Sequence, residues 1–443
     1  MGHFLQSGQR LVTAESLAAG DVTVLEYLDG GGQGEVYRAR FADRIVALKW
    51  YSPTYWPNDR TLSARLRLAV RYVRPTADYL WPFALVALPA QAGFGGYLMP
   101  LMEPRFQRLV HFLYGRIQPA PTFRVLATLG MNLARNLRSL HMAGLCYVDL
   151  NYNNIFCDFT TGDIAICDND NVTTDGIDTP LLGIPPFAAP EVLRDGVRPN
   201  SRTDLFALSV ILFQMFMISH PLIGRRATGL YDAAAQRRHH GTEPLFIFDP
   251  ADTSNAPVPG DPELGGEALN YWPIYPQFLR DVFIDAFTRG LHDPNARKTD
   301  LEWVAALSRL RDTMFHCSHC GAENFYDQDA VARSGGLANP CWHCKQIPPF
   351  PPQLRLKGDC VVLLDPGVRL FPSHLGVSTD YAHVLAEAER TGAGVSLKNL
   401  GPEKWAVSAP DGGYQEVVPG ASLPLVSGLR IYFGRVDGEV TCG

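Results

Sequence analysis

The chain has 443 residues and a formal net charge of −6, and 46% of its residues are hydrophobic while 19% are charged. This composition is typical of globular proteins with a sizeable core, and the length is enough for two to four domains. Without an excess of basic residues, nucleic acid is not an expected partner. The N-terminus lacks the charged and apolar regions of a secretion signal, so we expect a cytoplasmic protein.

The first hundred residues predict a β-rich segment. A glycine-rich turn, LDGGGQGEVY at 28–37, separates two apolar runs. A helical pattern rich in arginine covers 60–73, and two more strands are predicted around a glycine turn at 84–102. The expected strands before the helix are "VTVLEYL", "EVYRARF" and "RIVALKW".

From residue 121 to about 312 the pattern is mainly helical. Five leucines recur at three-and-four spacing and mark one buried helix face: Leu126, Leu129, Leu133, Leu137 and Leu140. The apolar run 205–219 is shorter than the roughly twenty residues of a membrane span, so it predicts a buried helix and no membrane partner. The segment 225–270 predicts an irregular surface insert. Beyond 355, short apolar runs between turns predict an all-β tail.

Three polar motifs point to phosphoryl transfer. Lys49 ends V-A-L-K on a predicted strand after the glycine turn, Asp149 and Asn154 lie in DLNYNN, and Asp168 lies in CDND. An amine on a strand can reach the phosphates of a nucleotide. One carboxylate can orient an attacking hydroxyl, while amide and carboxylate oxygens suit Mg²⁺. The spacing therefore predicts a nucleotide site.

With GIPPFAAPE at 183–191, SRTDLFALSVILF at 201–213 and DPNARKTDLEWV at 293–304, the motif order resembles the protein-kinase family over residues 20–312. The resemblance implies an α+β, two-lobed fold, with an N-terminal lobe over 1–102 and a C-terminal lobe over 103–313. It also implies a serine/threonine protein kinase that uses ATP and Mg²⁺ or Mn²⁺.

The resemblance assigns roles to individual residues. Asp149 is the expected catalytic base and acts with Lys49, Asn154 and Asp168 are the expected Mg²⁺ ligands, and the hinge around adenine is expected at 98–101. Residues of the scaffold are Glu191 paired with Arg297, and Asp204, which braces the catalytic loop. The residues expected to bind ATP are Gly31, Gly34, Val36, Ala47, Lys49, Met99 and Leu101.

The sequence departs from the family pattern in five places. Asp29 stands at the first loop glycine, Val148 at an arginine, Asn151 at a lysine and Asp170 at the glycine of D-F-G. Between Val36 and Met102 there is no glutamate to pair with the strand lysine, so Lys49 is expected to be held differently.

These departures have predicted consequences. Without the arginine, activity should not depend on phosphorylation of the activation loop. Asn151 and Asp170 should weaken the stabilisation of transition-state charge, which keeps an ATP-binding pseudokinase scaffold as an alternative. DLNYNN and ICDND also resemble aminoglycoside and choline kinases. The A-P-E motif and its arginine partner favour a protein substrate over these small molecules.

Two C-x-x-C pairs separated by twenty residues predict a structural zinc ribbon over 314–347. Four thiolates complete a tetrahedron and leave no open position for catalysis. The expected ligands are Cys317, Cys320, Cys341 and Cys344.

The tail over 354–443 resembles a forkhead-associated β-sandwich, on the basis of "LKNL" and of Gly428, Ile431 and Gly434. Ser373 and Asn399 are candidates for reading a phosphothreonine, but docking or structural support is the favoured role. The whole arrangement resembles bacterial eukaryotic-like kinases. Some of these accompany a von Willebrand-type protein and a cognate phosphatase, which implies such proteins as partners.

Overall fold

The computed structural model describes residues 3–14, 20–55, 60–89, 93–176, 183–230, 232–335, 338–358, 360–376, 378, 380–381, 383–392 and 394–442. Contacts divide the chain into two compact units. The first comprises residues 1–121, 128–271 and 282–304, and the second comprises 122–127, 272–281 and 305–443. Mixed helix and strand content agrees with the predicted α+β class.

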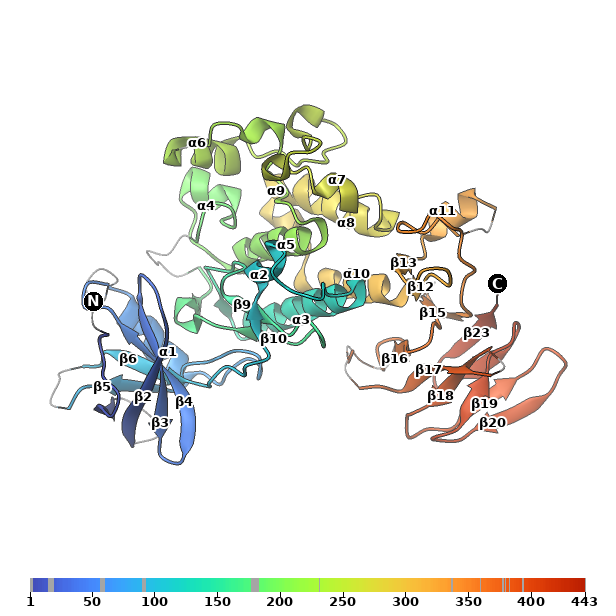
Figure 1. Cartoon of the computed structure of the whole chain (residues 1–443), viewed down its shortest axis with the longest axis horizontal. Helices are drawn as coiled ribbons and strands as arrows, with labels where there is room; N and C mark the ends of the chain where they lie inside the picture. The colour runs from blue at the N-terminus through green and yellow to red at the C-terminus, as the bar shows by residue number, and fades with distance from the viewer. Residues whose placement is uncertain are drawn as a thin grey trace. The chain divides into compact units, whose positions relative to one another are not determined.

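Six antiparallel strands at the start of the chain close into a barrel in the order β1-β2-β3-β4-β6-β5, drawn in blue in Figure 1. Helix α1 (Leu62–Arg71) follows β4 and lies within the predicted helix 60–73. Its Leu62 and Leu66 are buried with side chains of β4, β5 and β6. The strands are β1 (Arg10–Ala14), β2 (Asp21–Gly30), β3 (Gly34–Phe41), β4 (Arg44–Tyr51), β5 (Ala84–Ala87) and β6 (Gly96–Met99).

The chain between 107 and 312 is mainly helical, as predicted. The five leucines of the α3 pattern are at most 4% exposed. The described residues of 225–270 form only short helical pieces, as predicted, but the segment is not confined to the surface, since Phe246, Ile247 and Asn255 are at most 2% exposed. The α-helices are α2 (Leu109–Leu113), α3 (Phe123–Met142), α4 (Pro190–Asp195), α5 (Ser201–Met217), α6 (Ala233–Arg237), α7 (Ala268–Tyr271), α8 (Gln277–Phe287), α9 (Arg289–His292) and α10 (Asp300–Asp312).

Shorter elements complete this region. Strands β7 (Gln107–Arg108), β9 (Ile155–Cys157) and β10 (Ile164–Ile166) form one sheet, and β8 (Leu145–Cys146) pairs with β11 (Thr173–Thr174). Among the described residues, the 3₁₀ turns are η2 (Asn169–Asn171), η3 (Arg225–Ala227), η5 (Thr253–Asn255), η6 (Pro262–Leu264) and η7 (Pro294–Ala296), and η4 (Arg238–Thr242) is a π turn.

Helix α5 forms the apolar centre of the first unit. The Asn200 side chain caps it by accepting hydrogen bonds from the backbone N–H groups of Arg202 and Thr203. In return, Thr203 Oγ1 accepts the backbone N–H of Asn200. Such a reciprocal cap fixes where the helix begins. Most residues between Thr203 and Met217 are buried, as predicted for this apolar run. Among the described residues, no helix combines the length and apolar character that crossing a membrane requires.

The second unit contains the two C-x-x-C pairs and the β-rich tail. Strands β12 (Met314–His316) and β13 (Glu323–Phe325) form a hairpin followed by α11 (Gln328–Arg333). The tail has a six-stranded sheet, β15-β14-β23-β22-β19-β20, and a four-stranded sheet, β16-β17-β18-β21. Their strands are β14 (Gln353–Leu356), β15 (Val361–Leu363), β16 (Arg369–Leu370), β17 (Ala386–Thr391), β18 (Gly394–Asn399), β19 (Trp405–Ser408), β20 (Tyr414–Val417), β21 (Ser422–Pro424), β22 (Arg430–Tyr432) and β23 (Asp437–Thr441).

One hydrophobic core joins the two sheets of the tail. Leu354, Val407 and Ile431 from the six-stranded sheet lie in the same buried cluster as Ala388 and Leu397 from the four-stranded sheet. Alternation of apolar and polar residues along these strands places one face of each sheet in this core. The tail is therefore all-β, as its sequence predicted.

Candidate active site and metal centre

The loop between β8 and β9 is held by α5. Asp204, which is 2% exposed, accepts hydrogen bonds from the backbone N–H groups of Tyr147 at 2.6 Å and of Val148 at 3.1 Å. Val148 has a φ of 69°, in the left-handed region that β-branched residues disfavour. The two bonds from the loop to Asp204 therefore stabilise an unfavourable backbone conformation directly before Asp149.

Asp149 and Asn154 lie in contact within this loop. Asn154 Nδ2 donates to the carbonyl oxygen of Asp149 at 2.9 Å and lies 3.4 Å from Asp149 Oδ2. Asn151 Nδ2 donates to Asp149 Oδ1 at 3.1 Å. Burial raises the pKa of Asp149 to about 6, against the two amide donors, which lower it. A carboxylate with such a pKa is well suited to accept a proton near neutral pH.

Lys49, on β4, lies among oxygen atoms from distant parts of the chain. Its Nζ is 3.2 Å from Asp168 Oδ1, 3.0 Å from Asp170 Oδ2 and 2.8 Å from Gln33 Oε1. The Lys49 side chain is only 5% exposed, and burial alone would lower its pKa; Asp168 and Asp170 reverse this and raise it. The predicted lysine and Asp168 are thus brought together, whereas sequence reasoning did not expect Asp170 and Gln33 there.

Asp170, at the position of the D-F-G glycine, is buried beside Lys49 and is hydrogen-bonded within the protein. It is 1% exposed, and its carboxylate accepts bonds from Tyr51 Oη at 2.6 Å and Tyr97 Oη at 3.0 Å besides Lys49. Burial opposes its ionisation, but Lys49 and the two hydroxyls lower its pKa. An aspartate at the position of a small glycine is tolerated because a cation and two donors satisfy it.

The glycine-rich turn connects β2 to β3. Asp29 Oδ1 accepts a hydrogen bond from the N–H of Gly30 at 2.9 Å, and Asp29 Oδ2 pairs with Arg108. Arg108 therefore neutralises the carboxylate that replaces the first glycine. A Cβ atom at Gly34 would collide with the carbonyl oxygen of Trp50, so the close pairing of β3 and β4 explains this glycine. A Cβ atom at Gly31 would meet nothing within 4 Å.

The residues expected to contact adenine lie together. Ala47 pairs with Met99 across β4 and β6, and both belong to one apolar cluster. Val36 and Leu101 are partly buried against the same cluster. Val36 is also opposite Lys49 in the register of β3 and β4. The apolar surface and the buried amine are therefore adjacent, as a nucleotide with an adenine and a phosphate chain requires.

Glu191 and Arg297 form the predicted ion pair. Arg297 Nη1 and Nη2 donate to Glu191 Oε1 and Oε2, each at 2.7 Å, and Arg297 Nε donates to the carbonyl oxygen of Gly290 at 3.0 Å. The Arg297 side chain is 2% exposed and the Glu191 side chain is 11% exposed. The bidentate geometry ties α4 to the chain after α9.

We predict that Glu191→Gln lowers the free energy of unfolding by about 3 kcal/mol, because it leaves the buried charge of Arg297 without its partner. Asp195→Asn is the matched control, since Asp195 pairs with Arg194 on the same helix but at the surface. The control should show no measurable change. Chemical denaturation of both variants checks the prediction, and equal stabilities of the two variants would contradict it.

His141, near the end of α3, was not identified from the sequence. Its Nε2 lies 3.2 Å from Asp204 Oδ2 and its Nδ1 3.3 Å from Asp300 Oδ2, while Arg138 lies 3.7 Å from the other oxygen of Asp300. Burial lowers its pKa, but the bonds to the two carboxylates dominate and raise its pKa to about 9. Protonated His141 therefore stabilises the same Asp204 that holds the loop before Asp149.

The raised pKa of His141 predicts a pH dependence of stability. Its contribution is complete below the unfolded pKa of about 6.5 and is lost as pH rises through about 9. The wild-type chain should lose about 3 kcal/mol of unfolding free energy across this window because of His141. His141→Gln should lack this part of the decline. Denaturation at intervals from about pH 6 to 10 measures the difference, and parallel curves would refute the assignment.

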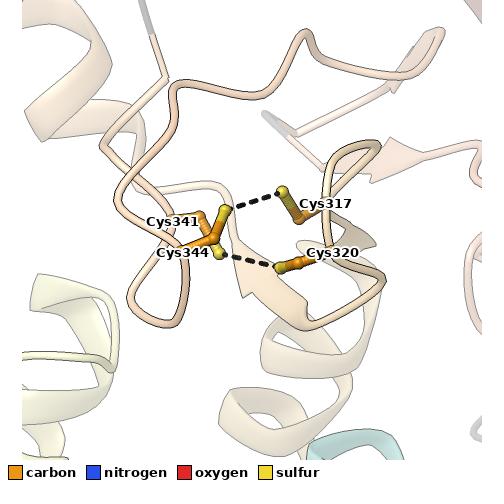
Figure 2. A group of neighbouring side chains, drawn as sticks. All are labelled: Cys317, Cys320, Cys341 and Cys344. Atoms are coloured by element: carbon orange, nitrogen blue, oxygen red, sulfur yellow. Dashed lines mark hydrogen bonds between the residues drawn. The ribbon is translucent and has the colours of Figure 1, made fainter.

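The four predicted cysteines converge. Cys317 Sγ lies 3.7 Å from Cys344 Sγ, and Cys320 Sγ lies 3.7 Å from Cys341 Sγ; all four sulfur atoms are within 4.8 Å of one another (Figure 2). A zinc ion bound by four thiolates has sulfur atoms about 3.8 Å apart. The group fits a structural zinc site, and Asn324 Nδ2 donates to Cys341 Sγ at 3.3 Å as an outer partner.

Acidic residues next to the cysteines cap two helices. Glu323 Oε2 accepts hydrogen bonds from the backbone N–H groups of Phe123 at 2.5 Å and Arg124 at 3.3 Å, in the first turn of α3. Asp327 Oδ2 accepts the N–H of Gln277, the first residue of α8, at 2.8 Å. Helix N-termini favour such carboxylates because their N–H groups lack helical partners. Glu323 and Asp327 thus stabilise the N-terminal ends of α3 and α8.

A family model described as the protein kinase domain matches residues 114–255. The chain is 30% identical over 226 residues to the DNA damage-responsive serine/threonine-protein kinase RqkA of Deinococcus radiodurans, over 48% of this chain and 32% of that protein. It is 32% identical over 105 residues to the serine/threonine-protein kinase Sgk1-B of Xenopus laevis, which covers 23% of this chain and 24% of that protein. It is also 32% identical over 108 residues to the serine/threonine-protein kinase RUNKEL of Arabidopsis thaliana, which covers 23% of this chain and 8% of that protein.

The matched part thus spans 32% or less of the length of these relatives. Residues 114–255 are thus similar to the protein kinase domain, and these relatives are serine/threonine kinases, in agreement with the resemblance of the motifs.

Proposed function

We propose that the chain is an ATP-dependent protein kinase that transfers the γ-phosphoryl group to serine or threonine of a protein. The observation that carries the proposal is the 3.2 Å contact between Lys49 and Asp168, which are 119 residues apart. The N–H of Cys167 donates to the carbonyl oxygen of Asn154 at 3.0 Å, so the segment carrying Asp168 is joined directly to the loop of Asp149. The similarity to serine/threonine kinases supports a protein as the substrate.

In this proposal each polar group has one task. Asp149 orients the attacking hydroxyl and accepts its proton, and Lys49 binds the α- and β-phosphates. Asn154, whose amide nitrogen is turned to Asp149, and Asp168, whose side chain is 37% exposed, offer oxygen atoms for Mg²⁺. Mg²⁺, when bound, neutralises charge on the phosphates. Ala47 and Met99 provide the apolar surface for adenine.

Purified protein incubated with Mg-ATP and three classes of acceptor tests the proposal. Phosphate should appear on serine or threonine of a generic protein acceptor or of the chain itself. Transfer to an aminoglycoside or to choline, without transfer to protein, would replace the proposal with a small-molecule kinase. ATP binding without any transfer would replace it with a pseudokinase scaffold.

The C-terminal part is proposed to be a zinc ribbon followed by a docking or structural β domain. The cysteine geometry supports the ribbon. Asn399, one candidate for phosphothreonine recognition, is fully buried; its Nδ2 donates to the carbonyl oxygens of Glu403 and Val417, and its Oδ1 accepts from Gly401. Its amide is therefore used inside the domain, which favours docking or support over phosphopeptide recognition.

The proposed partners follow from the resemblance alone, whereas the proposed location also draws on the cysteines. A von Willebrand-type protein and a cognate phosphatase are the partner classes that it implies, and a cytoplasmic location agrees with nine cysteines that form no disulfide among the described residues. Co-purification from the native host with the tagged full chain tests the partner classes. Recovery of neither protein class would remove this part of the proposal.

A further inference from the structure

Helix α1 contributes no carboxylate to the environment of Lys49. Its sequence, LSARLRLAVR, contains neither aspartate nor glutamate. Asp78, after the helix, accepts a hydrogen bond from Asn136 Nδ2 at 2.8 Å, and Asp59, before it, lies outside the described residues. Arg65 of α1 is buried, and its charge is opposite to that of the missing carboxylate.

The two carboxylates beside Lys49 differ in what they can do. Asp168 is 37% exposed and contacts Lys49 through one oxygen at 3.2 Å. Asp170 is buried and contacts it through both oxygens, at 3.1 and 3.0 Å. Tyr51 and Tyr97 each donate to a different oxygen of Asp170. Both carboxylate oxygens of Asp170 are therefore hydrogen-bonded within the protein, whereas the side chain of Asp168 is accessible to a ligand.

Arg65 connects α1 to the same residue from the other side. Its Nε donates to the backbone carbonyl oxygen of Asp170 at 2.9 Å. The guanidinium thus fixes the main chain of η2, while the side chain of Asp170 points to Lys49. In most of the family a glutamate on this helix pairs with the strand lysine. Here Asp170 supplies the carboxylate for Lys49, and Arg65 of α1 holds the backbone of Asp170.

We propose that Asp170 is the positioning residue of Lys49, with Tyr51, Tyr97 and Arg65 holding Asp170 in place. Lys49 is then set by the segment that also carries Asp168, so the amine and the metal-binding carboxylate are placed together. Asp168 is left free to bind metal because Lys49 already has a second carboxylate. The inference rests on the proposed nucleotide site and goes beyond it by assigning a role to a residue that the proposed reaction places in contact with neither the phosphates nor the attacking hydroxyl.

A double-mutant cycle on the full chain tests this inference. Mg-ADP and adenosine are titrated by calorimetry into wild type, Asp170→Asn, Lys49→Met and the double variant. Asp170→Asn should weaken ADP binding about tenfold, because it removes a charged partner of Lys49, and should leave adenosine binding unchanged. In the Lys49→Met background the same change should have less than about a twofold effect.

Equal effects of Asp170→Asn in both backgrounds would overturn the inference, because Asp170 would then act independently of Lys49. Asp43→Asn, an exposed aspartate of the same lobe, is the control and should change nothing. If wild type binds no Mg-ADP, the proposed nucleotide site fails instead.

A milder change keeps the inference testable if Asp170→Asn does not fold. Tyr51→Phe with Tyr97→Phe retains the ion pair but removes both hydroxyl donors to Asp170. ADP binding should weaken about threefold with adenosine binding unchanged. Unchanged ADP binding in this variant would contradict the proposed support of Lys49 through Asp170.

Discussion

Asp149→Asn is expected to slow phosphoryl transfer about a thousandfold while Mg-ADP affinity changes little, because a general base contributes on this order. Asparagine keeps the shape of Asp149 and can still accept the bond from Asn151 at Oδ1. Its amide nitrogen would face the donor Nδ2 of Asn154, so only the weaker 3.4 Å contact is lost. The amide cannot accept the proton of an attacking hydroxyl. Initial rates of transfer and calorimetric ADP titrations measure the two effects separately.

Asp163→Asn is the control for this substitution, since the Asp163 side chain is half exposed and pairs only at the surface with Arg105. It should leave both rate and affinity unchanged. A loss of less than tenfold in Asp149→Asn would show that another group accepts the proton. A matching loss of ADP affinity would show that the variant disturbs the site rather than the chemistry.

Removal of zinc is expected to have the largest effect on stability. Structural zinc sites contribute about 10–16 kcal/mol of apparent binding free energy, which is folding free energy for the segment they close. Glu323 and Asp327, beside the cysteines, cap the first turns of α3 and α8. Loss of the metal should therefore expose backbone amides at 122–127 and 277–281, not only those of the ribbon.

Metal analysis before and after chelation, with hydrogen exchange of both forms, checks this prediction. The native chain should hold one zinc ion, and Cys341→Ser should reproduce the effect of chelation. Cys442→Ser is the control, because Cys442 is an exposed thiol outside the cysteine cluster. Unchanged exchange at both helix starts in zinc-free protein would mean that the caps persist without the metal.

The sequence predicted the site best where the interacting residues lie in one short motif. Asp149 and Asn154 are five residues apart, so their contact follows from one short loop. The Glu191–Arg297 pair is distant in sequence and was predicted from the order of the motifs. Lys49 and Asp168 were predicted to share one site, but not to contact one another. Each pair is found in contact because the fold brings these segments together.

The sequence was least informative where a side chain takes over a role from another element. Asp170 was expected only to weaken the stabilisation of transition-state charge, and nothing local in the sequence showed that Lys49, Tyr51 and Tyr97 would contact it. The caps that Glu323 and Asp327 provide were also not predicted, since they join segments 200 and 50 residues apart. The predicted domain boundaries stay predictions. Each predicted domain is one continuous range of residues, whereas each compact unit of the structure combines several separate segments.

The most direct test of the central claim is the intact mass of phosphatase-treated full-length protein after incubation with Mg-ATP, beside Asp149→Asn. The account predicts a gain of one or more phosphate masses in wild type only, without prior phosphorylation of the activation loop. Tandem mass spectrometry should then place the phosphate on serine or threonine. An unchanged wild-type mass, together with no transfer to any added protein, would contradict the assignment as an active protein kinase.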